Sequence, residues 1–134
     1  MKILVIEDSR FLRLAIEKVL QQRGHEVTGA ADGEAGLRVA RTTPPQLILL
    51  DMMLPGLDGT GVLRELQQDP LTAQIPVVVL TSLSHKNEGT LKNAGAAAYI
   101  EKSWLNLDKN GELLVQVVEK TARRRLTGPS GRDR

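Results

Sequence analysis

Five short apolar runs alternate along the chain with segments whose apolar residues recur at helical spacing. Apolar runs without polar alternation are typical of parallel strands that helices cover on both faces. The runs predict strands at residues 2–7, 25–30, 46–51, 75–81 and 98–101. Between and after them we predict a helix from a cap at Ser9 to a stop at Gly24, and further helices at residues 34–42, 60–68, 86–94 and 112–125.

This order of elements predicts the fold class. Strands and helices that alternate through short connections form a parallel sheet with right-handed crossovers. The predicted class is therefore α/β, doubly wound, with helices on both faces of the sheet. A length of 134 residues suits one such domain.

The C-terminal residues differ from the rest of the chain in charge. Residues 1–119 contain 12 basic and 15 acidic side chains, a net charge of −3, whereas residues 120–134 contain 6 and 1, a net charge of +5. We expect a domain at residues 1–122 and a basic tail at residues 123–134, whose Gly, Pro and Ser content favours disorder. A contact of this tail with nucleic acid or an acidic partner is the alternative, but without interleaved aromatic residues a solvated terminus is preferred.

Composition narrows the possible chemistry. The hydrophobic fraction of 41% and the charged fraction of 25% are those of ordinary globular domains. No apolar run approaches the roughly 18 residues of a membrane span, and the N-terminal run is too short for a signal-peptide core, so we expect a cytoplasmic protein without membrane contact. The absence of cysteine excludes disulfides, thiolate catalysis and cysteine-ligated metals.

The predicted strands end in polar residues. Glu7 and Asp8 close the first strand, Asp51 closes the third, Thr81 closes the fourth, and Lys102 follows the fifth. In open parallel sheets, ligands bind beyond the carboxyl ends of the strands. We therefore expect these side chains to share one edge of the sheet and to form a binding site there.

Three carboxylates at one edge repel each other, so the cluster needs a cation, a proton or a lysine. Oxygen ligands without cysteine favour Mg²⁺ over zinc. Lys102 can pair with Asp51 or with a phosphate, and the Thr81 hydroxyl can donate to a phosphoryl oxygen. Taken singly, each residue has an ordinary structural role, and only their joint placement indicates a site. His25 and His85 are isolated, and we expect them to be surface residues without a functional role.

Several motifs occur together in one order. They are Asp51-Met-Met-Leu-Pro55-Gly-Leu-Asp58-Gly59, the upstream acidic pair, Thr81-Ser82 and Ala98-Tyr99-Ile100-Glu101-Lys102. With this spacing, roughly residues 1–122 resemble the CheY-like receiver domains of bacterial two-component response regulators. The resemblance implies a flavodoxin-like (βα)5 domain with a five-stranded parallel sheet of order 2-1-3-4-5.

The same resemblance implies roles for the site residues. Asp51 would accept a phosphoryl group from a histidine kinase or a phosphotransfer protein. Mg²⁺ would be held by Asp8, Asp51 and the Met53 carbonyl, with Glu7 acting through water. Lys102 would bridge to the phosphorylated Asp51.

The resemblance also implies how the domain signals. Thr81 would turn toward the phosphoryl oxygens and Tyr99 would follow inward, which changes the face formed by the fourth helix, the fifth strand and the fifth helix. The domain would be a phosphoacceptor that assists its own phosphorylation and dephosphorylation, not an enzyme with a separate substrate. The sequence does not name the kinase or the output partner, and nucleic acid is not expected to bind through this domain.

Two residues depart from the pattern of the family. Glu7 stands where the family more often has Asp, which moves the carboxylate outward by about one methylene. Ser103 follows Lys102 where the family usually has Pro after a typically cis bond. A cis bond before serine costs about 2.5–4 kcal/mol, so the geometry of this bond stays open at the level of sequence.

Two other functions compete with an isolated receiver. The chain could be the receiver part of a longer DNA-binding or enzymatic regulator that continues past Arg134. It could also be a small metal-dependent phosphatase or a flavin carrier of the same fold class, since fold alone implies no function. The sequence offers no further nucleophile and base for such an enzyme, and Phe11, Tyr99 and Trp104 are its only aromatic residues.

Overall fold

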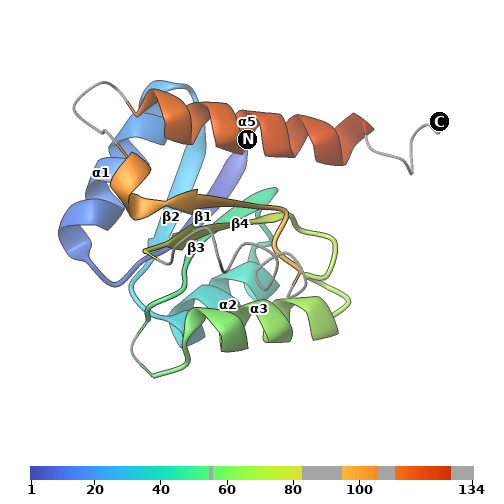
Figure 1. Ribbon diagram of the computed structural model, residues 1–134. Helices are drawn as coiled ribbons and strands as arrows, with labels where there is room; N and C mark the ends of the chain where they lie inside the picture. Colours follow the sequence, from blue (N-terminus) through green and yellow to red (C-terminus); the bar gives the residue numbers. More distant parts are fainter. Residues whose placement is uncertain (55, 83–94, 106–110, 128–134) are drawn as a thin grey trace.

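A computed structural model describes residues 1–54, 56–82, 95–105 and 111–127 (Figure 1). Its sheet has the order β2-β1-β3-β4-β5, and every pair of neighbouring strands is parallel. The strands are β1 (Lys2–Ile6), β2 (Glu26–Ala30), β3 (Leu47–Asp51), β4 (Val77–Thr81) and β5 (Ala98–Glu101). The predicted doubly wound α/β fold and its strand order are confirmed.

Helices cover both faces of the sheet (Figure 1). They are α1 (Arg10–Gln22), α2 (Gly33–Thr42), α3 (Gly59–Gln68) and α5 (Glu112–Thr127), with a short 3-10 helix, η2, at Lys102–Trp104. One core layer lies between the sheet and α2 and α3, and a second lies between the sheet and α1 and α5. The helix predicted at residues 86–94 lies outside the described residues.

The burial of each strand follows from its place in the order. All residues of the central strands β3 and β4 are buried, because helices cover both of their faces. In β2, at one edge of the sheet, three of five residues are exposed. Apolar runs in the sequence therefore mark the middle of the sheet more strongly than its edge.

Side-chain caps fix the beginnings of three helices. Ser9, Asp32 and Asp58 each accept a hydrogen bond from a backbone N–H three residues on. As a result α2 and α3 each begin one residue earlier than predicted. The stop at Gly24 is also found, since its φ of 90° lies in the left-handed region that favours glycine.

The C-terminal helix is longer than predicted. It continues to Thr127, two residues past the predicted end and five past the domain boundary expected at residue 122. Of the tail expected to be disordered at residues 123–134, residues 123–127 belong to this helix, and residues 128–134 lie outside the described residues. In the part of the chain that is described, no helix combines the length and the apolar composition needed to cross a membrane.

Gly59, the first residue of α3, lies against the chain at the end of β3. A side chain at this position is expected to lower the stability of the fold. A Cβ atom at Gly59 would clash with the backbone of Met52 and lie 2.8 Å from the Asp51 carbonyl oxygen. Gly59→Ala should lower the free energy of unfolding by about 1–2 kcal/mol, measured by urea denaturation.

The matched control is Gly61→Ala in the same helix. Its Cβ would meet only the flexible Leu57 side chain at 2.6 Å and the Asp58 carboxylate at 3.6 Å. Stability should therefore stay the same or rise, because alanine favours a helix. If both variants lose the same free energy of unfolding, the close contact with the backbone of Asp51 and Met52 is not the reason for glycine at position 59.

Candidate phosphoacceptor and metal site

The carboxyl ends of the strands bring the predicted acids together. One carboxylate oxygen from each of Glu7, Asp8 and Asp51 lies within 4.8 Å of the others. Asp51 ends the central strand β3 and is completely buried, whereas Glu7 is 1% exposed and Asp8 is exposed. The cluster therefore has a buried floor and one acid that reaches solvent.

Lys102 supplies the positive charge of the cluster. Its Nζ lies 3.1 Å from Asp51 Oδ1 and 3.3 Å from Glu7 Oε1. The lysine is placed by η2, which follows directly on β5. One ammonium thus faces two buried carboxylates, so the described residues leave a net negative charge at this edge.

Backbone donors hold the two buried acids in place. The Met53 N–H donates to Asp51 Oδ1 at 3.0 Å, and the Ser9 N–H donates to Glu7 Oε2 at 3.0 Å. Arg13, which sequence reasoning missed, donates to the Glu7 carbonyl oxygen at 2.8 Å and ties α1 to this loop. Its place in the first turn of an ordinary amphipathic helix gave no signal of this contact.

Two carboxylate oxygens at the site are left for a further partner. Among the described residues, Asp51 Oδ2 and Glu7 Oε1 are buried without a hydrogen-bond partner, and only Glu7 Oε1 has the ion pair with Lys102. Unpartnered buried carboxylate oxygens next to an exposed acid suit a hard divalent cation. The donor set therefore fits a magnesium site.

Comparison with known proteins decides the family. The profile described as "Response regulator receiver domain" matches residues 3–115. The chain belongs to the response regulator receiver family. It is a receiver domain, a signalling module of two-component systems.

Individual relatives of the receiver domain agree in sequence and in structure. "Protein PilH" of Pseudomonas aeruginosa is 32% identical over 75% of this chain and 84% of its own length. "Transcriptional regulatory protein AfsQ1" of Streptomyces coelicolor is 45% identical over 60% of this chain. The solved receiver domain of the Francisella response regulator 1452 has a TM-score of 0.80 and 28% identity, and the match covers 92% of this chain and 97% of that one.

The receiver chain is short beside some of these relatives. It spans 34% of AfsQ1 and 41% and 33% of two proteins called "Probable transcriptional regulator ycf27", from Porphyridium aerugineum and Cyanophora paradoxa. The relatives therefore include a short protein, PilH, and longer regulators, of which this chain matches only a part.

The receiver site perturbs the acid–base behaviour of two groups. Burial raises the pKa of the Glu7 carboxyl to about 7; the nearby Asp51 charge adds to the rise, while the Ser9 N–H and Lys102 oppose it. For Lys102, burial acts to lower the pKa, but the hydrogen bond to Asp51 and the charges of Asp51 and Glu7 raise it above its usual value. Lys102 is therefore charged at neutral pH, and Glu7 titrates there.

The two expected switch residues lie on neighbouring strands of the receiver. Thr81 is buried at the carboxyl end of β4, at the same edge as the acids, and pairs in register with Glu101. Tyr99 is half-buried, pairs in register with Val79 and packs against the core layer of α2 and α3. Thr81 shares the edge of the site, whereas Tyr99 lies two residues deeper along the sheet.

The two departures from the family pattern have structural outcomes. The Glu7 carboxylate is buried and held by the Ser9 N–H, so the extra methylene does not expel it from the cluster. There is no cis peptide bond in the described parts of the chain, so the Lys102–Ser103 bond is trans. Lys102 nevertheless reaches Asp51, which means that a proline after the lysine is not required for this contact.

One histidine differs from expectation. His25 was predicted to be a surface residue, but it is largely buried between Met1 and Glu119. Its Nδ1 lies 3.2 Å from the terminal amine of Met1, and its Nε2 lies 3.0 Å from Glu119 Oε2. No local pattern reveals a contact between residues 94 positions apart. His85 lies outside the described residues.

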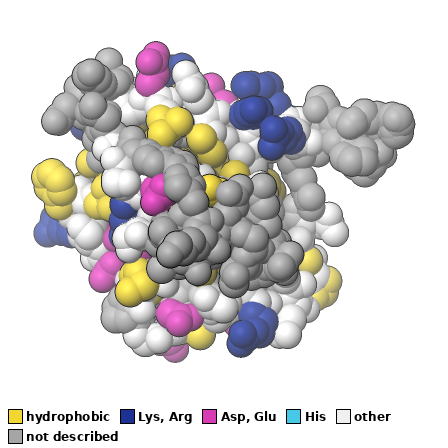
Figure 2. Space-filling model, viewed as in Figure 1, with side chains coloured by type: hydrophobic (Ala, Val, Ile, Leu, Met, Phe, Trp, Pro, Cys, Tyr) yellow, Lys and Arg dark blue, Asp and Glu magenta, His cyan; other side chains and the backbone are white. Residues whose placement is uncertain are grey.

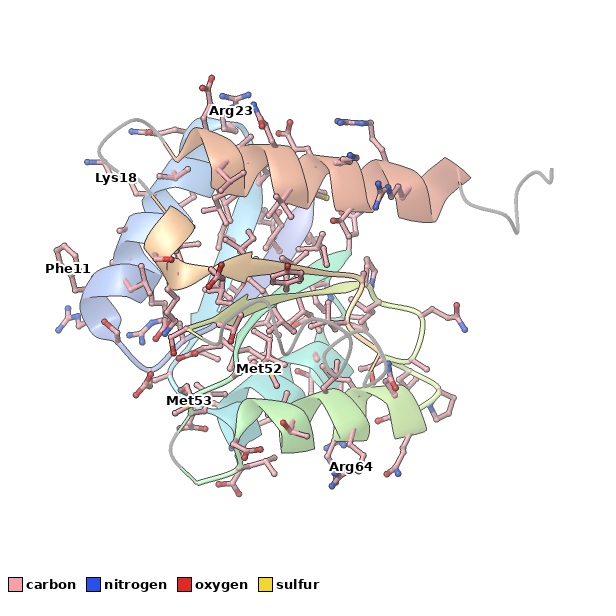
Figure 3. The ribbon with its side chains drawn as sticks, in the orientation of Figure 1. Phe11, Lys18, Arg23, Met52, Met53 and Arg64 are labelled. Atoms are coloured by element: carbon pink, nitrogen blue, oxygen red, sulfur yellow. The ribbon has the colours of Figure 1, made fainter. Side chains whose placement is uncertain are left out.

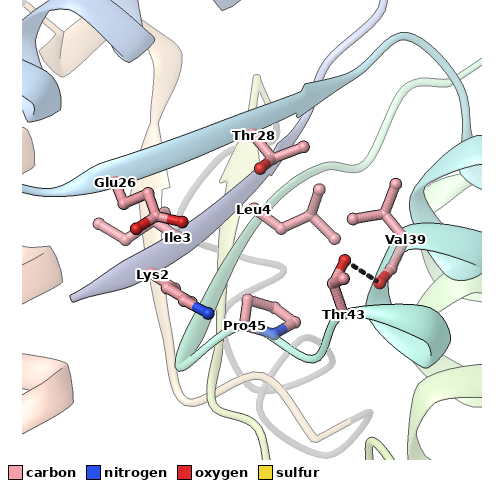
Figure 4. Close-up of a pocket in the computed structure, with 8 residues that line it drawn as sticks. All are labelled: Lys2, Ile3, Leu4, Glu26, Thr28, Val39, Thr43 and Pro45. Carbon is pink, nitrogen blue, oxygen red and sulfur yellow. Dashed lines mark hydrogen bonds between the residues drawn. The ribbon is translucent and has the colours of Figure 1, made fainter.

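Other features lie away from this edge. A pocket of about 160 Å³ opens where β1 and β2 begin (Figure 4), and its lining contains none of the predicted site residues. Met52 packs in the core on the α2 and α3 side, whereas the Met53 side chain is 63% exposed (Figure 3). Met53 thus presents an apolar side chain to solvent two residues after Asp51.

Proposed function

We propose that Asp51 is the phosphoacceptor of this receiver and that a histidine kinase or a phosphotransfer protein is its donor. The observation that carries the proposal is the placement of Asp51. It is a completely buried acid at the end of the central strand, with Oδ1 on Lys102 and Oδ2 without a hydrogen-bond partner among the described residues.

The chemistry follows from this placement. An oxygen of Asp51 attacks the phosphorus of the donor phosphohistidine in line, a P–O bond forms, and the bond from phosphorus to the donor nitrogen breaks. The Met53 N–H and Lys102 orient the carboxylate, and Lys102 offsets negative charge on the phosphoryl oxygens. The receiver thereby assists its own modification.

We propose Mg²⁺ as the cofactor, held by Asp8, Asp51 and the Met53 carbonyl oxygen, with Glu7 acting through water. When bound, the ion neutralises charge on the transferring phosphoryl group. The close acidic cluster and the buried Asp51 Oδ2, which has no hydrogen-bond partner among the described residues, support this assignment.

The output is proposed to be a change in the surface of α5, β5 and the segment before β5. A phosphoryl group adds a charge of about −2 and strong acceptor oxygens beside buried donors. Thr81, buried at the same edge of the sheet, would turn toward the phosphoryl oxygens, and Tyr99 on the neighbouring strand would follow it. The part of this surface at residues 86–94 lies outside the described residues.

The proposal extends to the cellular setting. The receiver would act in the cytoplasm, without membrane contact and without binding nucleic acid through this domain. An unidentified protein would read its state. The alternative is that the chain is the receiver part of a longer DNA-binding or enzymatic regulator. Asp51 would have the same role there. Relatives such as "Response regulator PleD", of which the match covers 19%, support this alternative.

Phosphotransfer profiling tests the proposal. Purified histidine kinases carrying labelled phosphate are mixed with the receiver and Mg²⁺, and one or a few should transfer label much faster than the others. The product should be an acyl phosphate, which base hydrolyses. A receiver that takes label from no kinase, no phosphotransfer protein and no small phosphodonor would contradict the proposed function.

Removing Asp8 should weaken Mg²⁺ binding more than removing Glu7. Asp8→Ala deletes a direct ligand and should weaken Mg²⁺ affinity roughly threefold or more, whereas Glu7→Ala deletes a group that acts through water and should weaken it less. Isothermal titration calorimetry measures both values. Glu26→Ala, at an exposed acid of β2, serves as the control, and equal losses for Asp8 and Glu7 would refute the assigned roles.

The phosphorylated state is expected to be long-lived. Hydrolysis needs a water in line behind the phosphorus, and the resemblance to the family implies that Met53 and Leu83, two residues after Asp51 and Thr81, flank that path. Met53 is apolar and exposed, and Leu83 lies outside the described residues. Met53→Asn and Met53→Glu should speed phosphate release several-fold with Mg²⁺ present.

Met53→Leu is the matched control, because it keeps an apolar side chain and the backbone N–H that holds Asp51. It should release phosphate at the wild-type rate. If the polar variants are no faster than wild type, access of water is not controlled at Met53, and the lifetime must be set by a kinase or a phosphatase.

A further inference from the structure

A pocket of about 270 Å³ lies at the amino ends of the central strands, at the opposite end of the sheet from the acidic cluster. Its lining comes from the residues before β1, β3 and β4 and from α5. The described lining residues are Met1, Pro45, Gln46, Gln74, Ile75, Pro76 and Ala122. Ile75 packs against the core layer of α2 and α3, whereas Met1 and Ala122 pack against the layer of α1 and α5. The pocket therefore lies where both apolar layers reach the end of the sheet.

The main chain around this pocket offers few polar groups to a ligand. Pro45 and Pro76 have no N–H. The Gln46 N–H donates to the Lys2 carbonyl oxygen at 2.8 Å, and the Pro76 carbonyl oxygen accepts from the Ile48 N–H at 3.0 Å. These backbone groups are thus absent or already used between strands, so recognition in the pocket depends on its side chains.

The Gln46 side chain keeps one donor for a ligand. Its Oε1 accepts a hydrogen bond from the Lys2 N–H at 2.8 Å, and this bond fixes the orientation of the amide, because only the oxygen can accept. Among the described residues, Gln46 Nε2 has no hydrogen-bond partner. A ligand that lies in the pocket can therefore place one acceptor atom on this amide nitrogen.

Charge in the described lining is limited to the terminal amine of Met1. This amine lies 3.2 Å from His25 Nδ1, and none of the described lining side chains is ionisable. Figure 2 shows Lys and Arg side chains gathered over the C-terminal half of α5, but the residue that α5 contributes to the lining is Ala122. Burial of an ionised ligand without a charged partner costs free energy, so the pocket favours an uncharged molecule.

The size and surface of the pocket favour an aromatic ring. An apolar cavity of about 150 Å³ binds benzene, so a pocket of about 270 Å³ suits one ring or two fused rings. Pro45 and Pro76 are buried and rigid, and proline rings pack well on aromatic faces. Met1 adds a thioether, which makes favourable contacts with aromatic rings. A helix, with a diameter of about 10 Å, is too wide for the same space.

We propose that the pocket between the amino ends of the central strands and α5 binds a small uncharged aromatic molecule of one or two rings, with one acceptor atom on Gln46 Nε2. β3 spans about 16 Å between this pocket and Asp51, so the two sites are separate. The inference does not depend on the proposed function, and Asp51→Asn should bind the same molecule as tightly as wild type does.

Titration with three aromatic probes of similar size tests the chemistry of the ligand. Quinoline is uncharged above neutral pH and has one acceptor nitrogen, naphthalene has no acceptor, and 2-naphthoate has a carboxylate. Binding is followed by the amide chemical shifts of isotope-labelled protein. Quinoline should give saturable shifts at the Gln46 and Ile75 amides and bind at least about threefold more tightly than naphthalene. 2-Naphthoate should bind more weakly than quinoline.

Two variants locate the site. Ala122→Leu fills the pocket and should weaken quinoline at least about tenfold. Gln46→Glu keeps the acceptor for the Lys2 N–H but removes the donor to the ligand, so it should weaken quinoline about fivefold and naphthalene less than about twofold. The matched control is Gln116→Leu, at an exposed position on another face of α5, which should stay within about twofold of wild type.

Melting curves check that each variant folds, and Gln46→Glu, at an exposed position, decides the test if Ala122→Leu does not fold. Several results would overturn the proposal. Quinoline shifts that do not saturate, or that persist unchanged in both variants, would place binding elsewhere. Tighter binding of 2-naphthoate than of quinoline would assign the pocket to an anion held by the Met1 amine. A dimer that Ala122→Leu dissociates would assign it to a second copy of this chain.

Discussion

Asp51→Asn is expected to abolish phosphorylation of this receiver. With acetyl phosphate and Mg²⁺, wild type should gain one phosphoryl mass in intact-protein mass spectrometry and the variant none. Asp51 is the acid at the end of the fully buried central strand, and it has Lys102 at 3.1 Å. An amide is too weak a nucleophile to replace the carboxylate, although it keeps the shape of the side chain.

A second acid of the same loop provides the control. Asp58 is exposed and caps α3 through its bond to the Gly61 N–H, a role that asparagine fills equally well. Asp58→Asn should therefore accept one phosphoryl group like wild type. Modification that persists in Asp51→Asn would move the phosphoacceptor to another residue and end the assignment.

Glu7→Gln is expected to stabilise the metal-free receiver at alkaline pH. Unfolding restores the ordinary pKa of Glu7, 4.5, whereas the folded value is about 7. Between these values the unfolded chain releases a proton that the folded chain keeps, so the free energy of unfolding of wild type falls as pH rises. One pKa unit corresponds to about 1.4 kcal/mol, so the variant should gain up to about 3 kcal/mol at pH 8.5.

The gain should depend on pH and on metal. Well below pH 4.5, Glu7 is protonated in both states and the difference between variant and wild type should nearly vanish. Saturating Mg²⁺ at pH 8.5 should restore wild type, because the ion offsets the buried charge. Urea denaturation with and without EDTA measures each value, with Glu26→Gln at an exposed position as the control. If the free energies of unfolding of wild type and Glu7→Gln change with pH in the same way, the pKa of Glu7 is not raised in the folded state.

Sequence reasoning reached the parts of the fold that local patterns encode. Apolar runs predict β3 and β4 because both strands are buried on both faces, and the cap at Ser9 is read from neighbouring residues. The gathering of Glu7, Asp8 and Asp51 was also predictable, because parallel strands place their carboxyl ends at one edge.

Contacts between distant segments were not predictable in the same way. Arg13 reaches the Glu7 carbonyl, and His25 joins Met1 to Glu119 on α5. Each depends on how a helix docks on the sheet, and neither residue breaks the local pattern around it. The geometry of the Lys102–Ser103 bond also required the structure, because the family pattern and the cost of a cis bond before serine gave opposing expectations.

The complete burial of β3 has a consequence for the order in which the domain opens. Its residues contribute to the apolar layers on both sides of the sheet, so its amide protons can meet solvent only when those layers separate. The exposed edge strand β2 can fray while β3 stays closed. Asp51 is thus carried by a segment whose amide hydrogen exchange reports global unfolding, and local opening elsewhere leaves the geometry of its carboxylate intact.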